Sequence, residues 1–320
     1  MATIREFQPT DADYQGVVNV QNAIYLDMPA VIEDYKEHDE HVGPKCVFKR
    51  WLALEGDQIV ADAQLIQYVW AYHPHKFNFY VRVMPAFRCR GIGTALYDTV
   101  MADAEQYDPI ELRTGTRSNF PDAIRFLEKR SFAEHMRHTE SHLDLAAADL
   151  SPWDGLEDKL RDEGIVLKSI RELRANGAPD WEHRLYEAMW IMLQDIPGSE
   201  DLTQPPFDTW RKENLETETL LPDAYLVALD GDDIVGLTQL WADRASDMLY
   251  TGFTGVKRDY RRRGIATALK ARAIRFGKQN NNSIIKTDNE EHNPMLGLNI
   301  RLGFVEQPAF VEYRKTLREE

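Results

Sequence analysis

One pattern occurs twice in this chain of 320 residues and constrains its fold more than any other feature. Each copy reads as a strand, an arginine-rich turn with a glycine, and an amphipathic helix. The copies are FYVRVMPAFRCRGIGTAL, residues 79–96, and TGFTGVKRDYRRRGIATALK, residues 251–270, in which Gly91 and Gly264 are equivalent. A single repeat of this length predicts two copies of one domain rather than a solenoid.

Each glycine turn is predicted to lie where a helix begins. The first backbone N–H groups of a helix have no partner within it, and the helix dipole favours negative charge at that end. Arg88 and Arg90 add positive charge to the first turn, as Arg261 and Arg263 do to the second. Both turns are therefore predicted to bind an anion, most simply a phosphate or pyrophosphate. The competing interpretation is that these arginines only provide surface charge.

Composition narrows the class of protein. The net charge of −15 argues against general nucleic-acid binding, and suits either attraction of a cationic substrate such as an amine or simple solubility. Cys46 and Cys89 have no disulfide or zinc spacing, and no metal site is predicted. No apolar run approaches the ~20 residues of a membrane helix, and the N-terminus is too polar for a secretory signal. A soluble cytoplasmic protein is expected, and its oligomeric state is not indicated.

The predicted elements follow the same order in both halves: strand, helix, hairpin, strand, glycine turn, helix, strand, helix, strand. This order is typical of an α/β fold with a mixed sheet. We expect domains over residues 1–148 and 165–320, joined by a connector helix over 149–164. Residues 30–49 and 198–222 are expected to have little regular structure. The first-half elements are expected over residues 3–7, 11–25, 51–54, 59–67, 77–83, 92–106, 110–114, 119–130 and 132–145.

Both halves resemble a known family in two signatures. The first, R/Q-x-x-G-x-G/A after a strand, occurs as RCRGIG from Arg88 and as RRRGIA from Arg261. The second, an asparagine that opens a helix ending in Gly-Phe, occurs from Asn293 and, less completely, from Asn119. Each half thus resembles a GCN5-related N-acetyltransferase (GNAT) domain, and the pair resembles the tandem GNAT proteins, similar in layout to mycothiol synthase. The resemblance covers nearly the whole chain and implies two tandem α/β domains, each a mixed, mostly antiparallel sheet flanked by helices.

The resemblance implies a cofactor, a substrate class and a reaction. The cofactor is acetyl-CoA or another acyl-CoA, and the reaction is N-acetyl transfer to a small-molecule amine. The pyrophosphate would lie on the backbone amides of the glycine turns, and the N–H near the strand valine would polarise the thioester carbonyl. The residues implied to contact the cofactor in the first half are Val83, Met84, Arg88, Arg90, Gly91, Ile92, Gly93, Thr94 and Asn119. Those in the second half are Val256, Lys257, Arg261, Arg263, Gly264, Ile265, Ala266, Thr267 and Asn293.

The match to the family is thinnest at the catalytic positions. Many GNAT enzymes have a tyrosine acid four residues before the glycine of Gly-Phe, where this chain has Leu127 and Asn299. Histone-modifying members have a glutamate base six residues before the strand valine, where it has Phe77 and Tyr250. Because Asn299 and Tyr250 are polar, we predict that the second half is catalytic and the first is a cofactor-binding or structural copy. The alternatives are a non-catalytic acyl-CoA-binding regulator and an interaction protein.

Overall fold

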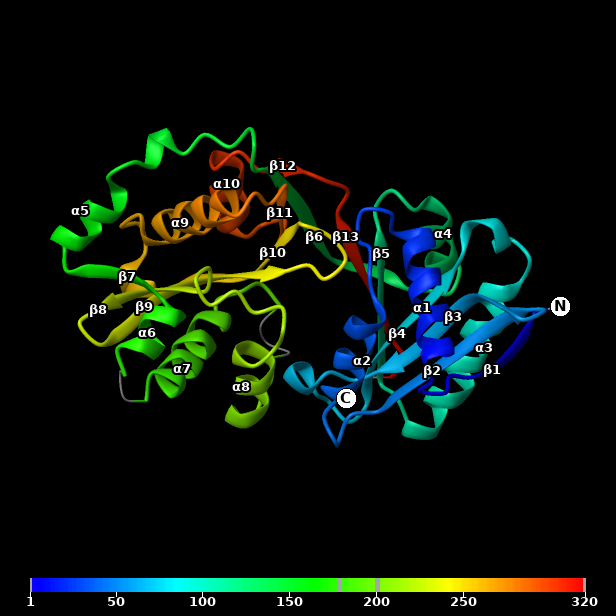
Figure 1. Ribbon diagram of the computed structural model, residues 1–320. Helices are drawn as coiled ribbons and strands as arrows, with labels where there is room; N and C mark the ends of the chain where they lie inside the picture. The colour runs from blue at the N-terminus through cyan, green and yellow to red at the C-terminus, as the bar shows by residue number, and fades with distance from the viewer. Residues whose placement is uncertain (1, 178–179, 199–201, 319–320) are drawn as a thin grey trace. The chain divides into compact units, whose positions relative to one another are not determined.

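The computed structural model describes residues 2–177, 180–198 and 202–318, and it divides the chain into two units (Figure 1). The first unit, called unit 1, consists of Met1–Met136 and Phe310–Glu320. The second, unit 2, consists of Arg137–Ala309. Each unit has its own set of paired strands and its own apolar core residues.

Unit 1 is built on a mixed sheet in the order β1-β2-β3-β4-β5-β13. Its neighbours are antiparallel except for β4 and β5, which are parallel. Apolar side chains of one sheet face pack against α3, whereas α1 and α2 supply polar partners to the other face. The strands are β1 (Thr3–Glu6), β2 (Phe48–Glu55), β3 (Gln58–Ile66), β4 (Lys76–Val83), β5 (Glu111–Arg117) and β13 (Phe310–Thr316). The helices are α1 (Asp11–Ile24), α2 (Ile32–Glu40), α3 (Ile92–Ala104) and α4 (Pro121–Glu128).

Unit 2 repeats this plan with the order β6-β11-β10-β9-β8-β7, in which β10 and β11 are the parallel pair. In Figure 1, α9 and α10 lie on one side of the sheet, and α6, α7 and α8 lie on the other. The strands are β6 (Ala133–Asp144), β7 (Ile165–Ser169), β8 (Leu226–Asp230), β9 (Asp233–Ala242), β10 (Leu249–Val256), β11 (Ile284–Glu290) and β12 (Val305–Glu306). The helices are α5 (Leu156–Asp162), α6 (Ile170–Ala175), α7 (Trp181–Leu193), α8 (Phe207–Leu215), α9 (Ile265–Gln279) and α10 (Pro294–Arg301).

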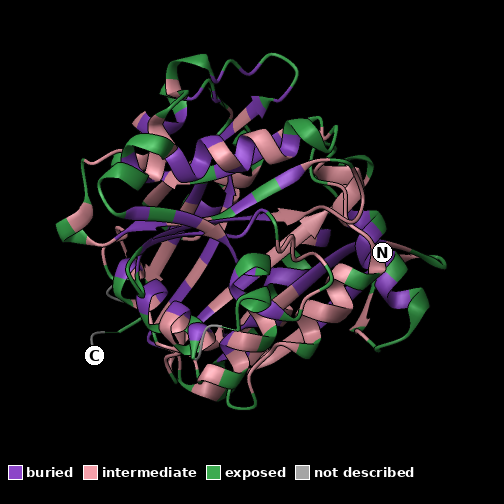
Figure 2. Ribbon diagram, turned by 60° about the vertical axis from the view of Figure 1, so that its left-hand side comes forward, coloured by how far each residue is buried: buried purple, intermediate pink, exposed green. Residues whose placement is uncertain are grey.

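The fold class predicted from the repeat is confirmed, and the predicted strands and helices around both glycine turns are present. Figure 2 shows that buried residues concentrate in the strands and on the helix faces turned toward them. This distribution follows from the two periodicities of the sequence, because strand positions alternate between faces and helix positions recur every three or four residues. Within the described residues, no helix combines the length and the apolar character needed to cross a bilayer.

The compact units differ from the expected domain ranges in the placement of one strand each. Residues 132–145 are expected to close the first half, but β6 enters unit 2 at Arg137 and pairs there with β11 from His138 to Asp144. In turn, the last strand of the chain, β13, pairs with β5 in unit 1. The cores explain the exchange, because Leu143 lies in the core of unit 2, whereas Val311 and Tyr313 lie in that of unit 1.

Two segments expected to have little structure contain helices. α2 lies within residues 30–49, and α8 lies within residues 198–222, of which 199–201 fall outside the described residues. α2 has few apolar side chains, so it shows no helical stripe in the sequence. It is held by polar contacts instead, since Asp34 accepts a hydrogen bond from the Val31 N–H and Tyr35 accepts one from Arg82 of β4. Arg82 lies far from α2 along the chain, which explains why sequence periodicity does not reveal this contact.

Candidate functional site

In each unit the two parallel strands separate before they end. β4 and β5 are paired only from Lys76 to Asn78, although β4 continues to Val83. β10 and β11 are paired only at Leu249 and Tyr250, although β10 continues to Val256. Beyond these points, β4 stays paired on its other side with β3, and β10 with β9. One edge of each strand is therefore left for other hydrogen-bond partners.

The strand valines predicted to contact the cofactor lie at the ends of these edges. The Met84 N–H donates to the Val60 carbonyl at 3.0 Å, and the Lys257 N–H donates to the Val235 carbonyl at 2.9 Å. Successive residues of a strand direct their N–H groups to opposite sides. The N–H groups of the preceding residues, Val83 and Val256, therefore point to the unpaired edge. That is the direction required for the predicted role toward an acyl carbonyl.

Both glycine turns have the backbone that the repeat predicts. Gly91 and Gly264 precede α3 and α9 with φ values of 82° and 87°, a left-handed conformation that favours glycine. Neither helix start has a side-chain cap among the described residues. Ile92 and Ile265, which follow the glycines, are buried and anchor the helices in the cores. The N–H groups of each first turn are thus positioned to bind an anion, as expected from an uncapped helix N-terminus.

The signature arginines hold each turn against its strand. Arg88 Nε donates to the Val83 carbonyl at 3.1 Å, and Arg261 Nε donates to the Val256 carbonyl at 3.0 Å. The arginine at the third position of each signature forms an ion pair, Arg90 with Glu55 at 3.3 Å and Arg263 with Glu163 at 3.1 Å. One contribution of these arginines is therefore structural, in addition to the positive charge that they bring to the helix start.

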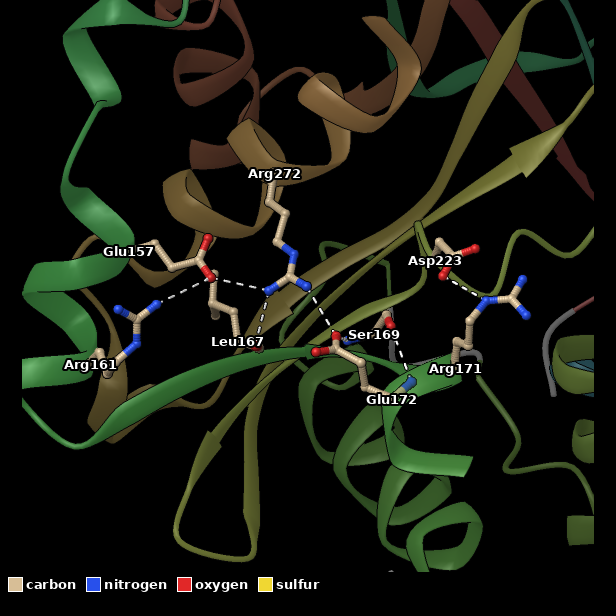
Figure 3. Close-up of polar contacts among 8 residues, drawn as sticks. All are labelled: Glu157, Arg161, Leu167, Ser169, Arg171, Glu172, Asp223 and Arg272. Carbon is tan, nitrogen blue, oxygen red and sulfur yellow. Dashed lines mark hydrogen bonds and ion pairs between the residues drawn. The ribbon is translucent and has the colours of Figure 1, made fainter. Parts of the chain in front are cut away.

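The two turns differ in their surroundings. A Cβ added at Gly91 would meet no atom within 4 Å, whereas one added at Gly264 would lie 3.1 Å from Leu156 Cδ1 of α5. Figure 3 shows how α5 is held there: Arg272 of α9 bonds Glu157 at 3.1 Å, and its other contacts are the Leu167 carbonyl and Glu172. The second turn is therefore flanked by the connector, and the first turn is open.

The arginines of the second turn also have an acidic partner. Asp195 accepts hydrogen bonds from Arg258 and Arg261, and its side chain is only 12% exposed. The hydrogen bond from Arg258, followed by that from Arg261, lowers the pKa of Asp195 below its ordinary value. Among the described residues, Arg88 of the first turn has no carboxylate partner. The sequence gives only a weak signal of Asp195: the segment Asp195-Ile196-Pro197 repeats Asp27-Met28-Pro29 of the first half.

Sequence analysis missed one cation at the first turn, Arg130. Its Nη2 lies 3.1 Å from Thr94 Oγ1, and its guanidinium lies 3.5 Å from the centroid of the Phe126 ring. Thr94 is in the first turn of α3, so Arg130 adds positive charge to the predicted anion site. The only sequence signal for Arg130 is its position two residues before Phe132. The Gly-Phe signature does not reveal it, because the residue before Phe132 is serine.

In unit 2, a tyrosine and an aspartate bridge the two strands where their pairing ends. The Tyr250 hydroxyl donates to Asp288 Oδ1, and His138 Nδ1 lies 3.9 Å from Asp288 Oδ2. Although the Tyr250 side chain is 39% exposed, desolvation of the hydroxyl and then the charge of Asp288 raise the pKa of Tyr250 well above its ordinary value. Tyr250 therefore keeps its proton at neutral pH and acts as a donor. Asp288, absent from the sequence prediction, is the hydrogen-bond acceptor of the pair.

Asn299, the other predicted catalytic residue, does not join this pair. It is fully buried, and its Nδ2 donates to Asn289 Oδ1 at 2.7 Å. Asn289 and Asp288 are neighbours on β11 and so point to opposite faces of the sheet. The structure thus places Tyr250 and Asn299 on different faces. An amide side chain also has no acidic proton, so Asn299 fits a structural role better than the predicted acid.

The two predicted asparagines differ as well. Asn293 caps α10, and its side chain accepts a hydrogen bond from the Met295 N–H at 2.9 Å. α4 instead begins after Phe120 and has no side-chain cap among the described residues, so Asn119 does not repeat this role.

At the positions equivalent to Tyr250 and Asp288, unit 1 has no ionisable group. In strand register the counterpart of Tyr250 is Asn78, because Tyr250 pairs with Lys286, Asn78 pairs with Arg113, and a bulge in β10 shifts the numbering by one. Gly115, the counterpart of Asp288, is covered by Phe310, whose ring would lie 2.1 Å from a Cβ at that glycine. The carboxylate of Asp62 already accepts two hydrogen bonds from Arg82, one from Nη2 at 2.7 Å and one from Nε at 3.0 Å. Arg82 Nη1 donates further to Gln21 and Tyr35. Among the described residues, unit 1 thus has the same type of turn without a tyrosine–aspartate bridge between its separated strands, and the carboxylate opposite Gly115, that of Glu312, forms an ion pair with Arg314 at 2.8 Å.

Comparison with known proteins identifies the family. Two stretches, residues 18–132 and 183–304, match the description "Acetyltransferase (GNAT) family", and together they cover most of the chain. The chain belongs to this family. It is a tandem GNAT protein, with one GNAT repeat in each half. No curated protein sequence matches it. The similarity in layout to mycothiol synthase stays a prediction.

Solved structures agree with this assignment at the level of the fold. A tandem GNAT protein from the clavulanic acid biosynthesis pathway has a TM-score of 0.76 and 17% identity, with 100% of both chains covered. A GCN5-related N-acetyltransferase from Sphaerobacter thermophilus has a TM-score of 0.70 and 20% identity, covering 99% of this chain and 96% of that one. At such identities the likeness shows a shared fold. Acyl-CoA is the class of cofactor that this acetyltransferase family uses.

One group of side chains has donors that a metal ion needs. Glu290, Glu291 and His292 offer ligand atoms within 4.8 Å of one another, but Glu291 and His292 are exposed at a turn. Exposed acidic groups of this kind are common without a metal, so this cluster is not evidence for a metal site.

Proposed function

We propose that this tandem GNAT protein transfers an acetyl group from acetyl-CoA to the amine of a small molecule, with the second half catalytic. One observation carries the assignment to the second half: the Tyr250–Asp288 pair bridges β10 and β11 where their pairing ends. The positions that correspond in strand register in the first half are Asn78 and Gly115, neither of which is ionisable. The first half is proposed to be a cofactor-binding copy, because its turn is open.

The residues present fit an acyl-CoA in chemistry. The uncapped first turn of α9 suits a pyrophosphate, and the unpaired edge of β10 suits the amide groups of a pantetheine arm. When bound, the acyl-CoA supplies an activated thioester for attack by the amine. The Val256 N–H lies on that edge and is available to an acyl carbonyl. Holding cofactor and amine on one strand edge raises their effective concentration.

Asp288 is proposed to act as the general base. An amine must lose a proton to become a nucleophile, and a carboxylate beside it can accept that proton. The Tyr250 hydroxyl holds Asp288 in place by its hydrogen bond and, because its pKa is raised, remains a donor throughout neutral pH. Glu140, opposite Asp288 in the β6–β11 register, adds negative charge that suits an ammonium group. The net charge of −15 favours approach of the same cationic acceptor.

A non-catalytic acyl-CoA-binding role is the second candidate. It is favoured by Asn299, which is buried where many family members have a tyrosine acid. The first glycine turn is compatible with either role, since binding alone requires no proton transfer. A protein of this kind would bind acetyl-CoA but release no CoA with any amine.

The deciding experiment combines binding and turnover in a matched pair of variants. Acetyl-CoA is titrated calorimetrically into wild type, Gly91→Glu and Gly264→Glu, and CoA release is followed with a panel of small amines. We expect Gly264→Glu to abolish transfer and Gly91→Glu to retain it. Loss of transfer in Gly91→Glu with retention in Gly264→Glu would overturn the assignment of the halves. Binding without turnover in any variant would favour the regulator, and no binding would refute both.

A further inference from the structure

Positive charge gathers in unit 1 where the two parallel strands separate. Arg82 lies near the end of β4, and Arg117 is the last residue of β5. Both lie beyond the residues at which these strands pair with each other. Arg88 lies in the glycine turn that follows β4, and its Nε donates to the Val83 carbonyl at 3.1 Å. Three arginines from three parts of the chain are therefore brought to the separated ends of the strands.

Tyr25, the residue that follows α1, lies among these arginines. Its ring centroid is 5.4 Å from the guanidinium carbon of Arg117. It is also 5.8 Å from the ring centroid of Phe120, which in turn lies 5.9 Å from the guanidinium carbon of Arg88. The rings of Tyr25 and Phe120 thus connect the arginine of the glycine turn with the arginine at the end of β5.

The same face of α1 reaches the third arginine, Arg82. The Tyr25 N–H donates to the Gln21 carbonyl at 2.9 Å, so the two residues are one helical turn apart on the same face. The side chain of Gln21 accepts a hydrogen bond from Arg82 Nη1 at 2.6 Å. α1 therefore meets β4 through Gln21 and β5 through Tyr25, which places the phenol between the two strand ends.

The hydroxyl of Tyr25 has no hydrogen-bond partner among the described residues. Desolvation raises the pKa of Tyr25, and the charge of Asp62 adds to the rise. The charges that oppose it are those of Arg82, Arg117 and Arg88. The hydroxyl is therefore a protonated donor with cations around it. A tyrosine hydroxyl that is partly buried usually finds an acceptor, and an anionic acceptor would suit the nearby cations as well.

The carboxylates of this region do not balance its arginines. Arg82 forms an ion pair with Asp62, whose side chain is 1% exposed. Arg117 forms an ion pair at 2.8 Å with Asp27, whose side chain is 44% exposed. The Nη groups of Arg88 have no hydrogen bond or ion pair within the part of the chain that the structure describes. Three cations thus face two acids, and the pair at Arg117 lies at the surface, where a ligand can approach.

The second half has the opposite charge at the corresponding point. Strand register gives the counterparts, because β10 pairs with β9 and β11 as β4 pairs with β3 and β5. Glu290 follows Asp288 on the same face of β11, so the strand ends of unit 2 are acidic. The positions that correspond to Arg82, Asp62 and Arg117 are Gly255, Leu237 and Glu290.

We propose that the first half binds a carboxylate where β4 and β5 separate, with the Tyr25 hydroxyl and Arg88 as donors and the charge of Arg117 beside them. A guanidinium matches a carboxylate in shape and charge, and a phenol adds a neutral donor. The carboxylate has two possible sources, the far end of a dicarboxylic acyl chain on CoA or a free carboxylic acid. The first source rests on the proposed function, because it needs an acyl-CoA on the first glycine turn.

Matched acyl-CoAs test the first source. Succinyl-CoA and butyryl-CoA have acyl chains of equal length, which end in a carboxylate and a methyl group. Each is titrated calorimetrically into Gly264→Glu protein, which leaves the first turn, and into Gly91→Glu protein, which leaves the second. We expect the first half to prefer succinyl-CoA at least about tenfold, the gain from one charge-assisted hydrogen bond. The second half should prefer butyryl-CoA, because its strand ends are acidic.

A free acid tests the second source. Saturation-transfer NMR measures the binding of succinate to wild type, with butyramide as the uncharged control. Binding of succinate but not butyramide, without a preference between the two acyl-CoAs, would assign the carboxylate to a free acid.

Single substitutions test the residues. Tyr25→Phe removes only the hydroxyl, and Arg117→Met removes a charge that Arg117→Lys keeps. We expect the carboxylate preference to fall about threefold or more in Tyr25→Phe and to vanish in Arg117→Met, with part of it retained in Arg117→Lys. Tyr72→Phe removes another partly buried hydroxyl of unit 1 and should keep the full preference. Urea unfolding checks that each variant is folded.

The outcomes separate this inference from the proposed function. Equal affinity of the first half for the two acyl-CoAs, together with no binding of succinate, would overturn the inference and leave the proposed function standing. A preference that persists in both folded Tyr25→Phe and folded Arg117→Met proteins would also overturn it. If wild type binds no acyl-CoA, the proposed function fails, and the succinate measurement alone decides the inference.

Discussion

The two halves of this protein share a cofactor-type backbone and differ in the side chains around it. Both have separated parallel strands, a left-handed glycine and an uncapped helix start. In the first half the turn is open, but Asn78 and Gly115 occupy the positions that correspond to Tyr250 and Asp288. In the second half that pair is present, but Leu156 and Asp195 flank the turn. The comparison teaches that the same backbone geometry at the glycine turn can carry different side chains around it, so any difference in activity between the halves would have to come from those side chains.

The largest effect is expected from Asp288→Asn. The amide cannot accept the proton of an ammonium, so kcat should fall by ~10²–10⁴, the usual contribution of a general base. Steady-state release of CoA measures this loss. The matched control is Asp230→Asn, which removes another tyrosine–aspartate bond of unit 2, from Tyr260 at 2.8 Å, and should leave kcat unchanged. Equal loss in both variants, or none in Asp288→Asn, would contradict a specific role for the bridge.

A change in the first half should affect stability rather than activity. Asp62→Ala leaves Arg82 buried without its carboxylate, which should cost about 3–5 kcal/mol of unfolding free energy. Urea unfolding measures the cost. Asp11→Ala, which breaks the exposed pair with Lys36, should cost less than about 1 kcal/mol. If folded Asp62→Ala protein lost acetyl transfer, the division of roles between the halves would be wrong.

The glycine turns themselves can be compared by alanine substitution. Both variants put a Cβ on a residue with a left-handed backbone, which should cost about 1–3 kcal/mol of unfolding free energy. Only Gly264→Ala also forces that Cβ against Leu156. Gly264→Ala should therefore destabilise more than Gly91→Ala, by about 1 kcal/mol or more from overpacking. Thermal unfolding of both gives the difference. Adding Leu156→Ala should recover part of it, and no recovery would show that the connector does not press on this turn.

The smallest effect is expected from Asp195→Asn and depends on pH. Because Arg258 and Arg261 lower the pKa of Asp195, its contribution is present above the unfolded pKa near 4 and is lost as pH falls through the folded pKa. At pH 7 the variant should be less stable by roughly 1 kcal/mol, and the difference should vanish in acid. Unfolding curves between pH 3 and 7 test this. A difference that stays constant over that range would mean that the ion pairs do not contribute.

Much of the fold was predictable because its signals are local. The alternation of apolar residues, the hairpin turns and the repeated glycine turn each depend on neighbours within a few positions. Local signals therefore located the helices after Gly91 and Gly264 and the strands before them. They failed for α2, whose stabilising partner Arg82 lies far along the chain, and for β6 and β13, whose pairing is exchanged between the units.

The sequence by itself determined the repeat, the family and both anion-type turns, because these depend on residue types at set spacings. It also identified Tyr250, although not its partner. Only the tertiary structure decided that Asp288 meets Tyr250, that Asn299 is buried on the other face, and that Lys270 is buried against the Phe304 ring. These properties arise where strands and helices distant in sequence pack together. Burial and proximity set the charge and reach of a side chain, and neither can be read from spacing alone.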